Sequence, residues 1–348
     1  MKSIELRAYR AMAGLAIGDA LSWPALFHRS LLLPPWTRRI RREMDAAMES
    51  SKTTRLPLPF SLNQPAAAFE TGPADDSEWA AFTALRLLET DGQLNRENIA
   101  DSWMALAKSP ETVRGPVSVQ SALANLRRGI LPPASGHDNP HYFDDAALCR
   151  AVPIGIICTG YPEKAAELAG LEAEVTQSED GLWATQAFAA AVSLACAGGN
   201  AGAAVDAAVN QLPADTWIRR RAQESLRAAR EADSLLTLLS LLNGTIVNRE
   251  YSYGSAAPET LAVTLAIVQH CGGDFEQAVT AACAVAKTAD SVPAQVGALC
   301  GALAKRDILP ESWRKQITHL KGICLPSLAG MDYLDLSRRL AVLATEIE

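Results

Sequence analysis

Apolar residues recur at three- and four-residue spacing along most of this chain, which is the pattern of amphipathic or buried helices. Trp79, Phe82, Leu85 and Leu88, for example, fall on one helical face. The two-residue alternation that half-buried strands show is weak throughout. The pattern therefore predicts an all-α fold, built as a compact bundle of many helices.

The helices predicted from this spacing include 4–21, 77–90, 98–107, 183–197, 201–211, 217–242, 258–270, 275–287 and 290–304. Pro258 at the first turn and Gly272-Gly273 after the last turn bracket one of them. The segments 31–71 and 108–145 are rich in proline and polar residues, and we expect them to be long irregular loops. Because no flexible linker interrupts the 348 residues, we expect a single domain over 1–348.

Two acidic segments stand directly before predicted helices. One carries Asp75 and Asp76, and the other carries Thr288, Asp290 and Ser291. Helix capping explains most acids at such positions, and that alternative stays open. Oxygen ligands suit Mg²⁺, Mn²⁺ or Ca²⁺ rather than zinc, and no His or Cys cluster in the sequence favours zinc. We predict that the two helix starts converge on one hard cation.

Composition narrows the class of protein. A net charge of −7 argues against a general nucleic-acid binder, although the basic cluster at 37–42 is either a docking site for an anion or a solvated helix face. The mostly apolar stretch 184–199 is too short and too rich in alanine to span a bilayer, so we expect a buried helix and no membrane contact. The seven cysteines include no Cys-x-x-Cys pair, which favours reduced thiols and a cytoplasmic location.

Five motifs in order resemble those of the ADP-ribosylglycohydrolase family. Residues 14–21 are similar to its opening helix, 75–77 to its Thr-Asp-Asp-Thr motif, and 149–155 to its Met-Arg-x-x-Pro-Ile-Gly stretch. Asp290 and Ser291 fall where its Asp-x-Asp-Thr motif ends, and 296–313 resembles its closing helices. The resemblance implies an all-α ADP-ribosylglycohydrolase-like domain.

The resemblance also implies chemistry. A hydrolase of this kind would cleave an N- or O-ribosyl bond with the help of Mg²⁺ or Mn²⁺, with Asp75 or Asp76 as the base. The implied metal ligands are Asp75, Asp76 and Asp290, with Ser291 or Thr288 adding a neutral oxygen. The implied partner is a small ribosyl compound or an ADP-ribosylated protein.

Several positions depart from the family pattern. Ala74 replaces a threonine, Thr288 replaces an aspartate, and Leu26 stands where many members have a glutamate. Each of the first two changes removes a ligand oxygen or a charge, so we predict one bound ion or none. Asp19, in the opening motif, is expected to support the site rather than react.

The predicted substrate site is altered as well. Asp144 and Asp145 replace a Gly-Asn-Gly turn ahead of Arg150, and Gln177 stands where the family has a histidine. Two carboxylates would repel a diphosphate, so we predict that Asp144, Asp145 and Arg150 bind a small ribosyl substrate that lacks a diphosphate. Alternatively, Asp144 and Asp145 only cap the following segment. A non-catalytic relative, serving as a ligand-binding or scaffold protein, is the competing interpretation of all these changes.

Overall fold

The computed structural model describes residues 3–22, 72–248, 250–251, 253–285, 287–306, 308 and 311–346. In these residues it contains sixteen α-helices and no strand, which confirms the predicted all-α fold. The first eight helices are α1 (Ser3–Leu21), α4 (Asp75–Glu89), α5 (Arg96–Lys108), α6 (Val117–Arg127), α7 (Ala134–His137), α8 (Leu148–Ile157), α9 (Pro162–Ala173) and α10 (Glu179–Ala197). The others are α11 (Ala201–Gln211), α12 (Trp217–Glu231), α13 (Leu235–Leu241), α14 (Ala257–His270), α15 (Phe275–Cys283), α16 (Val292–Leu303), α17 (Glu311–Ile317) and α18 (Tyr333–Glu346).

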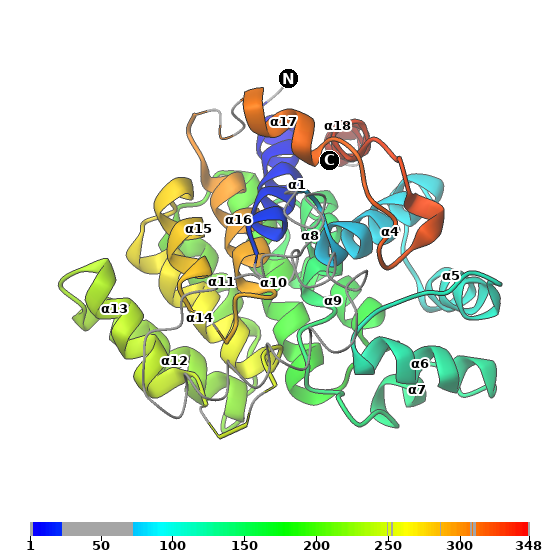
Figure 1. The fold of residues 1–348 in the computed structure, drawn as a ribbon, viewed down its shortest axis with the longest axis horizontal. Coiled ribbons are helices and arrows are strands. Elements are labelled where there is room, and N and C mark those ends of the chain that lie inside the picture. Colours follow the sequence, from blue (N-terminus) through cyan, green and yellow to red (C-terminus); the bar gives the residue numbers. More distant parts are fainter. Residues whose placement is uncertain are drawn as a thin grey trace, which may run out of the picture.

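Helix α10 lies at the centre of the bundle and packs against α8, α9, α11, α14 and α16 (Figure 1). Its alanine-rich sequence explains this position, because small side chains let several helices approach one another. Ala187, Phe188, Ala191 and Ala195 are fully buried. The sequence therefore predicted correctly that this stretch is a buried helix. None of the described helices has the length and apolar character needed to cross a membrane.

Helices α1 and α16 run antiparallel in close contact, side by side in Figure 1. A Cβ atom on Gly18 would lie 1.9 Å from the carbonyl oxygen of Pro293, and one on Gly14 would lie 2.1 Å from that of Gly297. Only glycine fits where two backbones approach so closely. This register places the end of α1 beside the start of α16.

The structure corrects several predicted boundaries. The helix expected over 217–242 breaks into α12 and α13, because Ser234 begins a new helix by accepting a hydrogen bond from the Thr237 amide at 3.2 Å. The helix expected from residue 290 begins at Val292, with Pro293 in its first turn. The helix expected over 275–287 ends at Cys283.

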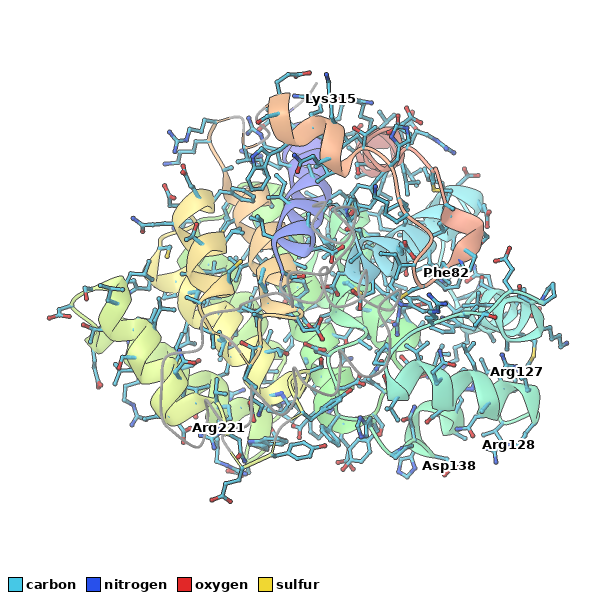
Figure 2. The ribbon with its side chains drawn as sticks, in the orientation of Figure 1. Phe82, Arg127, Arg128, Asp138, Arg221 and Lys315 are labelled. Carbon is cyan, nitrogen blue, oxygen red and sulfur yellow. The ribbon has the colours of Figure 1, made fainter. Side chains whose placement is uncertain are left out.

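The segment 108–145, expected to be irregular, contains α6 and α7. Val119, Leu123 and Leu126 form a buried helical stripe in α6 whose signal was obscured by the surrounding proline and glycine. The segment 31–71, the basic cluster at 37–42 and Leu26 lie outside the described residues. Among the labelled side chains, Arg127, Arg128, Arg221 and Lys315 lie at the periphery of the molecule (Figure 2).

Candidate active site

The first acidic segment forms the beginning of α4, with Asp75 and Asp76 in its first turn. Ala74, the residue at the N-cap, has no polar side chain with which to bind the free amides of that turn. The carboxylate of Asp19 in α1 performs this role. Its Oδ2 accepts hydrogen bonds from the amides of Ala74 (2.7 Å) and Ser77 (3.0 Å) and from the Ser77 hydroxyl (2.6 Å). Helix α1 thus determines where α4 and its two acids begin.

A second carboxylate attaches the same turn to a distant loop. Glu78 is buried and accepts hydrogen bonds from the amides of Ile323 (2.7 Å), Cys324 (2.7 Å) and Leu325 (2.9 Å). Burial raises the pKa of the Glu78 carboxyl, and the three amides oppose that shift. The start of α4 is therefore fixed from two sides.

The second acidic segment is a turn that leads into α16. The Thr288 amide donates to the carbonyl of Val285 at 3.1 Å, and the Val292 amide donates to the carbonyl of Thr288 at 3.0 Å. The ammonium group of Lys287 pairs with the buried Glu259 of α14 at 2.6 Å. Because α14 and α16 both hold this turn, the backbone around Asp290 has a defined position.

Asp76 lies where the two acidic segments come together. Burial raises its pKa well above the ordinary value of 3.8, and the negative charges of Asp75, Asp19, Asp145 and Asp290 raise it further. Carboxylates repel one another in this way only when they are close. Residues of both acidic segments therefore contribute to one electronegative environment around Asp76, and their convergence on a cation stays a prediction.

The chemical nature of these donors fits a hard divalent cation, because carboxylate and hydroxyl oxygens are the ligands that Mg²⁺ and Mn²⁺ prefer. In the described part of the chain, however, no group of three or more His, Cys, Asp or Glu side chains has the geometry to hold an ion. The Thr288 hydroxyl donates to the Val285 carbonyl at 3.3 Å. The predicted ligands Asp75, Asp76, Asp290, Ser291 and Thr288 therefore stay a prediction.

The two aspartates of the altered turn have different surroundings. Asp144 is fully buried and accepts hydrogen bonds from the Gln177 amide group (2.8 Å), the Ala146 backbone amide (3.1 Å) and the Tyr253 hydroxyl (3.0 Å). The bond to Ala146 is the local capping interaction that the sequence left open. These contacts give Asp144 a role in holding the turn, and direct contact with a substrate stays a prediction.

Asp145 is oriented toward the acidic centre instead. Its Oδ2 accepts a hydrogen bond from the side chain of Gln295 in α16 at 3.2 Å. Burial raises the pKa of Asp145 well above its ordinary value, and the charges of Asp144 and Asp290 add to the shift. Asp145 is therefore part of the electronegative centre.

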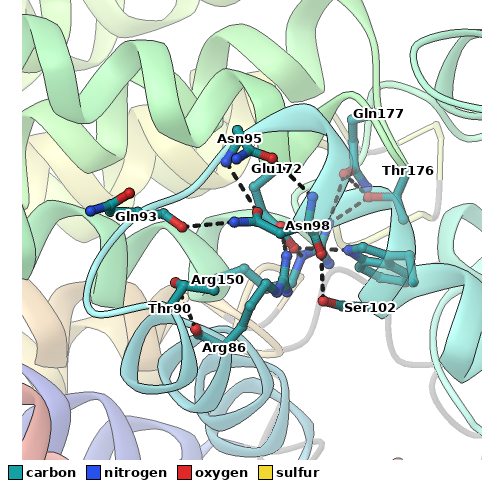
Figure 3. Close-up of polar contacts among 11 residues, drawn as sticks. Arg86, Thr90, Gln93, Asn95, Asn98, Ser102, Arg150, Glu172, Thr176 and Gln177 are labelled. Atoms are coloured by element: carbon teal, nitrogen blue, oxygen red, sulfur yellow. Dashed lines mark hydrogen bonds and ion pairs between the residues drawn. The ribbon is translucent and has the colours of Figure 1, made fainter.

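Arg150 belongs to a buried ionic network (Figure 3). Its Nε lies 3.2 Å from the Glu172 carboxylate, and Arg86 binds the other oxygen of that carboxylate at 2.7 Å. The remaining nitrogens of Arg150 donate to the Ala146 carbonyl and the Thr176 hydroxyl. These contacts assign Arg150 a structural role between α8 and the segment after α9, and its predicted contact with substrate stays untested.

Sequence reasoning missed two groups at the site. Glu78 stands in the first turn of α4, but its partners lie almost 250 residues away, so the sequence carries no signal for the contact. Cys149 is buried beside the acids: burial raises its pKa well above 9.0, and the charges of Asp76, Asp75 and Asp145 raise it further. Burial and these charges therefore favour the neutral thiol of Cys149 over the thiolate, which is the reactive form.

A cavity of about 790 Å³ lies elsewhere in the fold. Apolar residues of α1, α15 and α16 line it, among them Ile17, Phe275 and Leu303, together with Trp313 of α17. None of the aspartates of the acidic centre lines this cavity. The cavity is therefore separate from the acidic centre.

Comparison with known proteins agrees with the geometry. The sequence model of the ADP-ribosylglycohydrolase family matches residues 1–345. The chain belongs to the ADP-ribosylglycohydrolase family. A solved structure described as an "ADP-ribosylglycohydrolase-related protein complex" has the same fold, with a TM-score of 0.61 and 20% identity over 99% of this chain and 100% of that one. No curated protein matches the chain in sequence.

Family membership supports a function of the glycosyl hydrolase type. Proteins of this family act on ADP-ribosylated substrates and generally depend on a divalent metal ion. The family therefore points to metal-dependent cleavage of a glycosidic bond as the class of reaction to test at the acidic centre.

Proposed function

We propose that this protein is a metal-assisted glycoside hydrolase that cleaves an N- or O-ribosyl bond. One divalent ion, Mg²⁺ or Mn²⁺, would be held by Asp75, Asp76 and Asp290, with Ser291 or Thr288 as a neutral ligand. The observation that carries the proposal is the pKa of Asp76, which burial and four neighbouring aspartates raise. A divalent cation would relieve this repulsion, which is a physical reason for the acids to be gathered here.

In such a reaction the cation and the aspartates would have different roles. A bound cation supplies Lewis-acid activation of water and of ribose hydroxyls. We assign the general base to Asp75 or Asp76, which accepts the proton of the attacking water as the anomeric carbon becomes oxocarbenium-like.

For the substrate, we propose a small ribosyl compound without a diphosphate. Support comes from Asp145, whose carboxylate lies at the acidic centre and would face the bound ligand. Burial raises the pKa of both Asp144 and Asp145 and favours their neutral forms. Their repulsion of a diphosphate is therefore weaker than that of two ionised carboxylates. A neutral or cationic leaving group fits this environment better than an anionic one.

One observation favours a second candidate, a non-catalytic ligand-binding or scaffold protein. In the described residues the acids have no arrangement that could hold an ion, and Ala74 supplies no oxygen ligand. A protein with this fold could bind a ribosyl ligand without cleaving it. The two candidates differ in turnover, which a direct assay measures.

The assay compares release of base from ribosyl compounds with release of ADP-ribose from a modified protein, each with Mg²⁺ or Mn²⁺. We expect activity on the former, abolished in Asp75→Ala and Asp76→Ala and retained in Asp101→Ala, whose side chain is exposed on α5. Calorimetry should give at most one tight Mn²⁺ site, weakened in Asp290→Ala. Faster release of ADP-ribose would refute the substrate, and no turnover of either substrate would favour the non-catalytic candidate.

A further inference from the structure

The carboxylate of Asp144 is fully buried, and hydrogen-bond donors from separate segments of the chain surround it. Its Oδ1 accepts from the Gln177 side-chain amide (2.8 Å) and the Ala146 backbone amide (3.1 Å), and its Oδ2 accepts from the Tyr253 hydroxyl (3.0 Å). Amides and hydroxyls are groups with which proteins bind oxyanions. These three donors together form a site for one oxyanion, and Asp144 occupies it.

The amide group of Gln177 is held in the orientation that this site requires. Its Oε1 accepts hydrogen bonds from the Thr176 hydroxyl and from a guanidinium nitrogen of Arg150, the latter at 3.4 Å. Because a guanidinium group can only donate, the oxygen of Gln177 faces Arg150 and its nitrogen faces Asp144. The contacts with Thr176 and Arg150 do not involve Asp144, so the donor should keep its orientation when the carboxylate is removed.

The backbone of this turn is also attached independently of the carboxylate. The Asp145 amide donates to the carbonyl of Ser255 at 2.9 Å, and the Ala257 amide donates to the carbonyl of Phe143 at 3.0 Å. These two bonds join the turn to the start of α14 on both sides of residue 144. Tyr253 is only partly buried, so its side of the site lies near solvent. A variant that lacks the carboxylate should therefore present the same donors to a small anion.

We propose that Asp144 fills, from within the protein, a subsite for an oxyanion such as a phosphate group, and that Gln177 and Tyr253 determine substrate specificity by holding it there. A phosphate group beside this turn would find the donors already bonded. That a ribosyl ligand lies beside the turn rests on the proposed function, whereas the oxyanion subsite does not.

Exclusion by occupancy differs from repulsion by charge. A carboxyl group that fills the subsite excludes a phosphate group even in its neutral form, which burial favours by raising the pKa of Asp144. Repulsion, in contrast, requires the ionised form. The two explanations therefore make different predictions for a neutral side chain of the same size.

Two substitutions at this position separate the explanations. Asp144→Ala empties the subsite, whereas Asp144→Asn removes the charge and keeps a side chain of the same size with an acceptor oxygen. Asp101→Ala is the control for net charge, because it removes one exposed carboxylate of α5. For each protein we would measure the affinity for inorganic phosphate, adenosine and ADP-ribose by calorimetry, without divalent ions.

We expect Asp144→Ala to bind inorganic phosphate about 10-fold more tightly than the wild-type protein, which corresponds to one hydrogen bond to a charged acceptor. The ratio of ADP-ribose affinity to adenosine affinity should rise by a similar factor. Both quantities should stay near the wild-type values in Asp144→Asn and Asp101→Ala. Adding Gln177→Leu to Asp144→Ala should remove the gain, because it replaces a donor by an apolar side chain of similar size.

Two results would overturn the inference: equal phosphate affinity in Asp144→Ala and Asp101→Ala, or an equal gain for ADP-ribose in Asp144→Asn and Asp144→Ala, which would leave charge repulsion as the explanation. If none of the proteins binds adenosine or ADP-ribose, the proposed ribosyl substrate fails instead, and the phosphate titrations still decide whether the subsite exists. If Asp144→Ala does not fold, Asp144→Ser takes its place, because its hydroxyl can still accept from the Ala146 amide while the side of Tyr253 is opened.

Discussion

The contact between α1 and α16 gives the most direct test of the fold. In Gly18→Ala, the new Cβ atom would lie 1.9 Å from the carbonyl oxygen of Pro293 and 2.7 Å from the amide nitrogen of Ala294. Real Cβ contacts essentially never fall below 3.0 Å, so the two helices must separate locally by roughly 1 Å. The obstructing atoms belong to backbone, which cannot turn aside as a side chain would.

Two effects of opposite sign follow from this substitution. Helix propensity alone favours alanine over glycine by about 1 kcal/mol. Overpacking costs about 1 to 3 kcal/mol. Separating the two helices by roughly 1 Å also removes about a quarter to a half of the dispersion attraction between the atoms that move apart. Because α1 and α16 are in close contact, we expect the overpacking cost to exceed the gain in helix propensity and the free energy of unfolding to fall by up to about 2 kcal/mol.

Urea unfolding followed by circular dichroism measures this change. Gly202→Ala in α11 is the matched control, since its Cβ would meet only Asn200 Oδ1 at 3.4 Å and Gln269 Oε1 at 3.9 Å. The control should be stabilised by about 0.5 to 1 kcal/mol. If Gly18→Ala is as stable as the wild-type protein or more stable, the backbones of α1 and α16 do not approach as closely at Gly18 as described.

Two further predictions concern buried charge. Glu172→Gln leaves Arg86 and Arg150 without their shared counter-charge, so it should lower the free energy of unfolding, measured by urea titration, by about 3 to 5 kcal/mol. Glu174→Gln is the control, because its partner Arg96 is exposed. It should change the free energy of unfolding by less than about 1 kcal/mol. Burial and the charge of Asp75 raise the pKa of Asp19 from 3.8 to about 7, so the folded protein binds more protons than the unfolded chain between these values and stability falls as pH rises through them. Without divalent ions, the urea unfolding midpoint of the wild-type protein should therefore fall more steeply between about pH 4 and pH 7 than that of Asp19→Asn. The same dependence of the midpoint on pH in the two proteins would contradict this prediction.

Much of the architecture was predictable from local pattern. The apolar spacing of α4, α10 and α14 predicted long buried helices, and the acids at 75–76 marked the start of α4. Pattern failed at α7, which has only four residues, and at α6, which lies between segments rich in proline and glycine. It also failed at Asp290, which precedes the helix because Pro293 favours the first turn of α16.

The contacts that fix the candidate site could not be predicted. Asp19 binds residues near 75, and Glu78 binds residues near 324, so each contact depends on how distant helices pack. A single sequence shows that these acids exist without showing which amides they meet. The same limit applies to Arg150, whose motif resembles a ligand-binding stretch while its guanidinium is engaged with Glu172.

The attachment of α4 and α16 to α1 has a consequence for which side chains of this protein can change. The frame of the candidate site is made from backbone amides, a glycine contact and the carboxylates of Asp19 and Glu78. The side chain of Ala74 takes no part in it, and Thr288 contributes mainly its backbone. Architecture and side-chain chemistry are therefore separable at these two positions: a substitution at 74 or 288 can change the polar groups at the acidic segments while the hydrogen bonds that hold the scaffold remain.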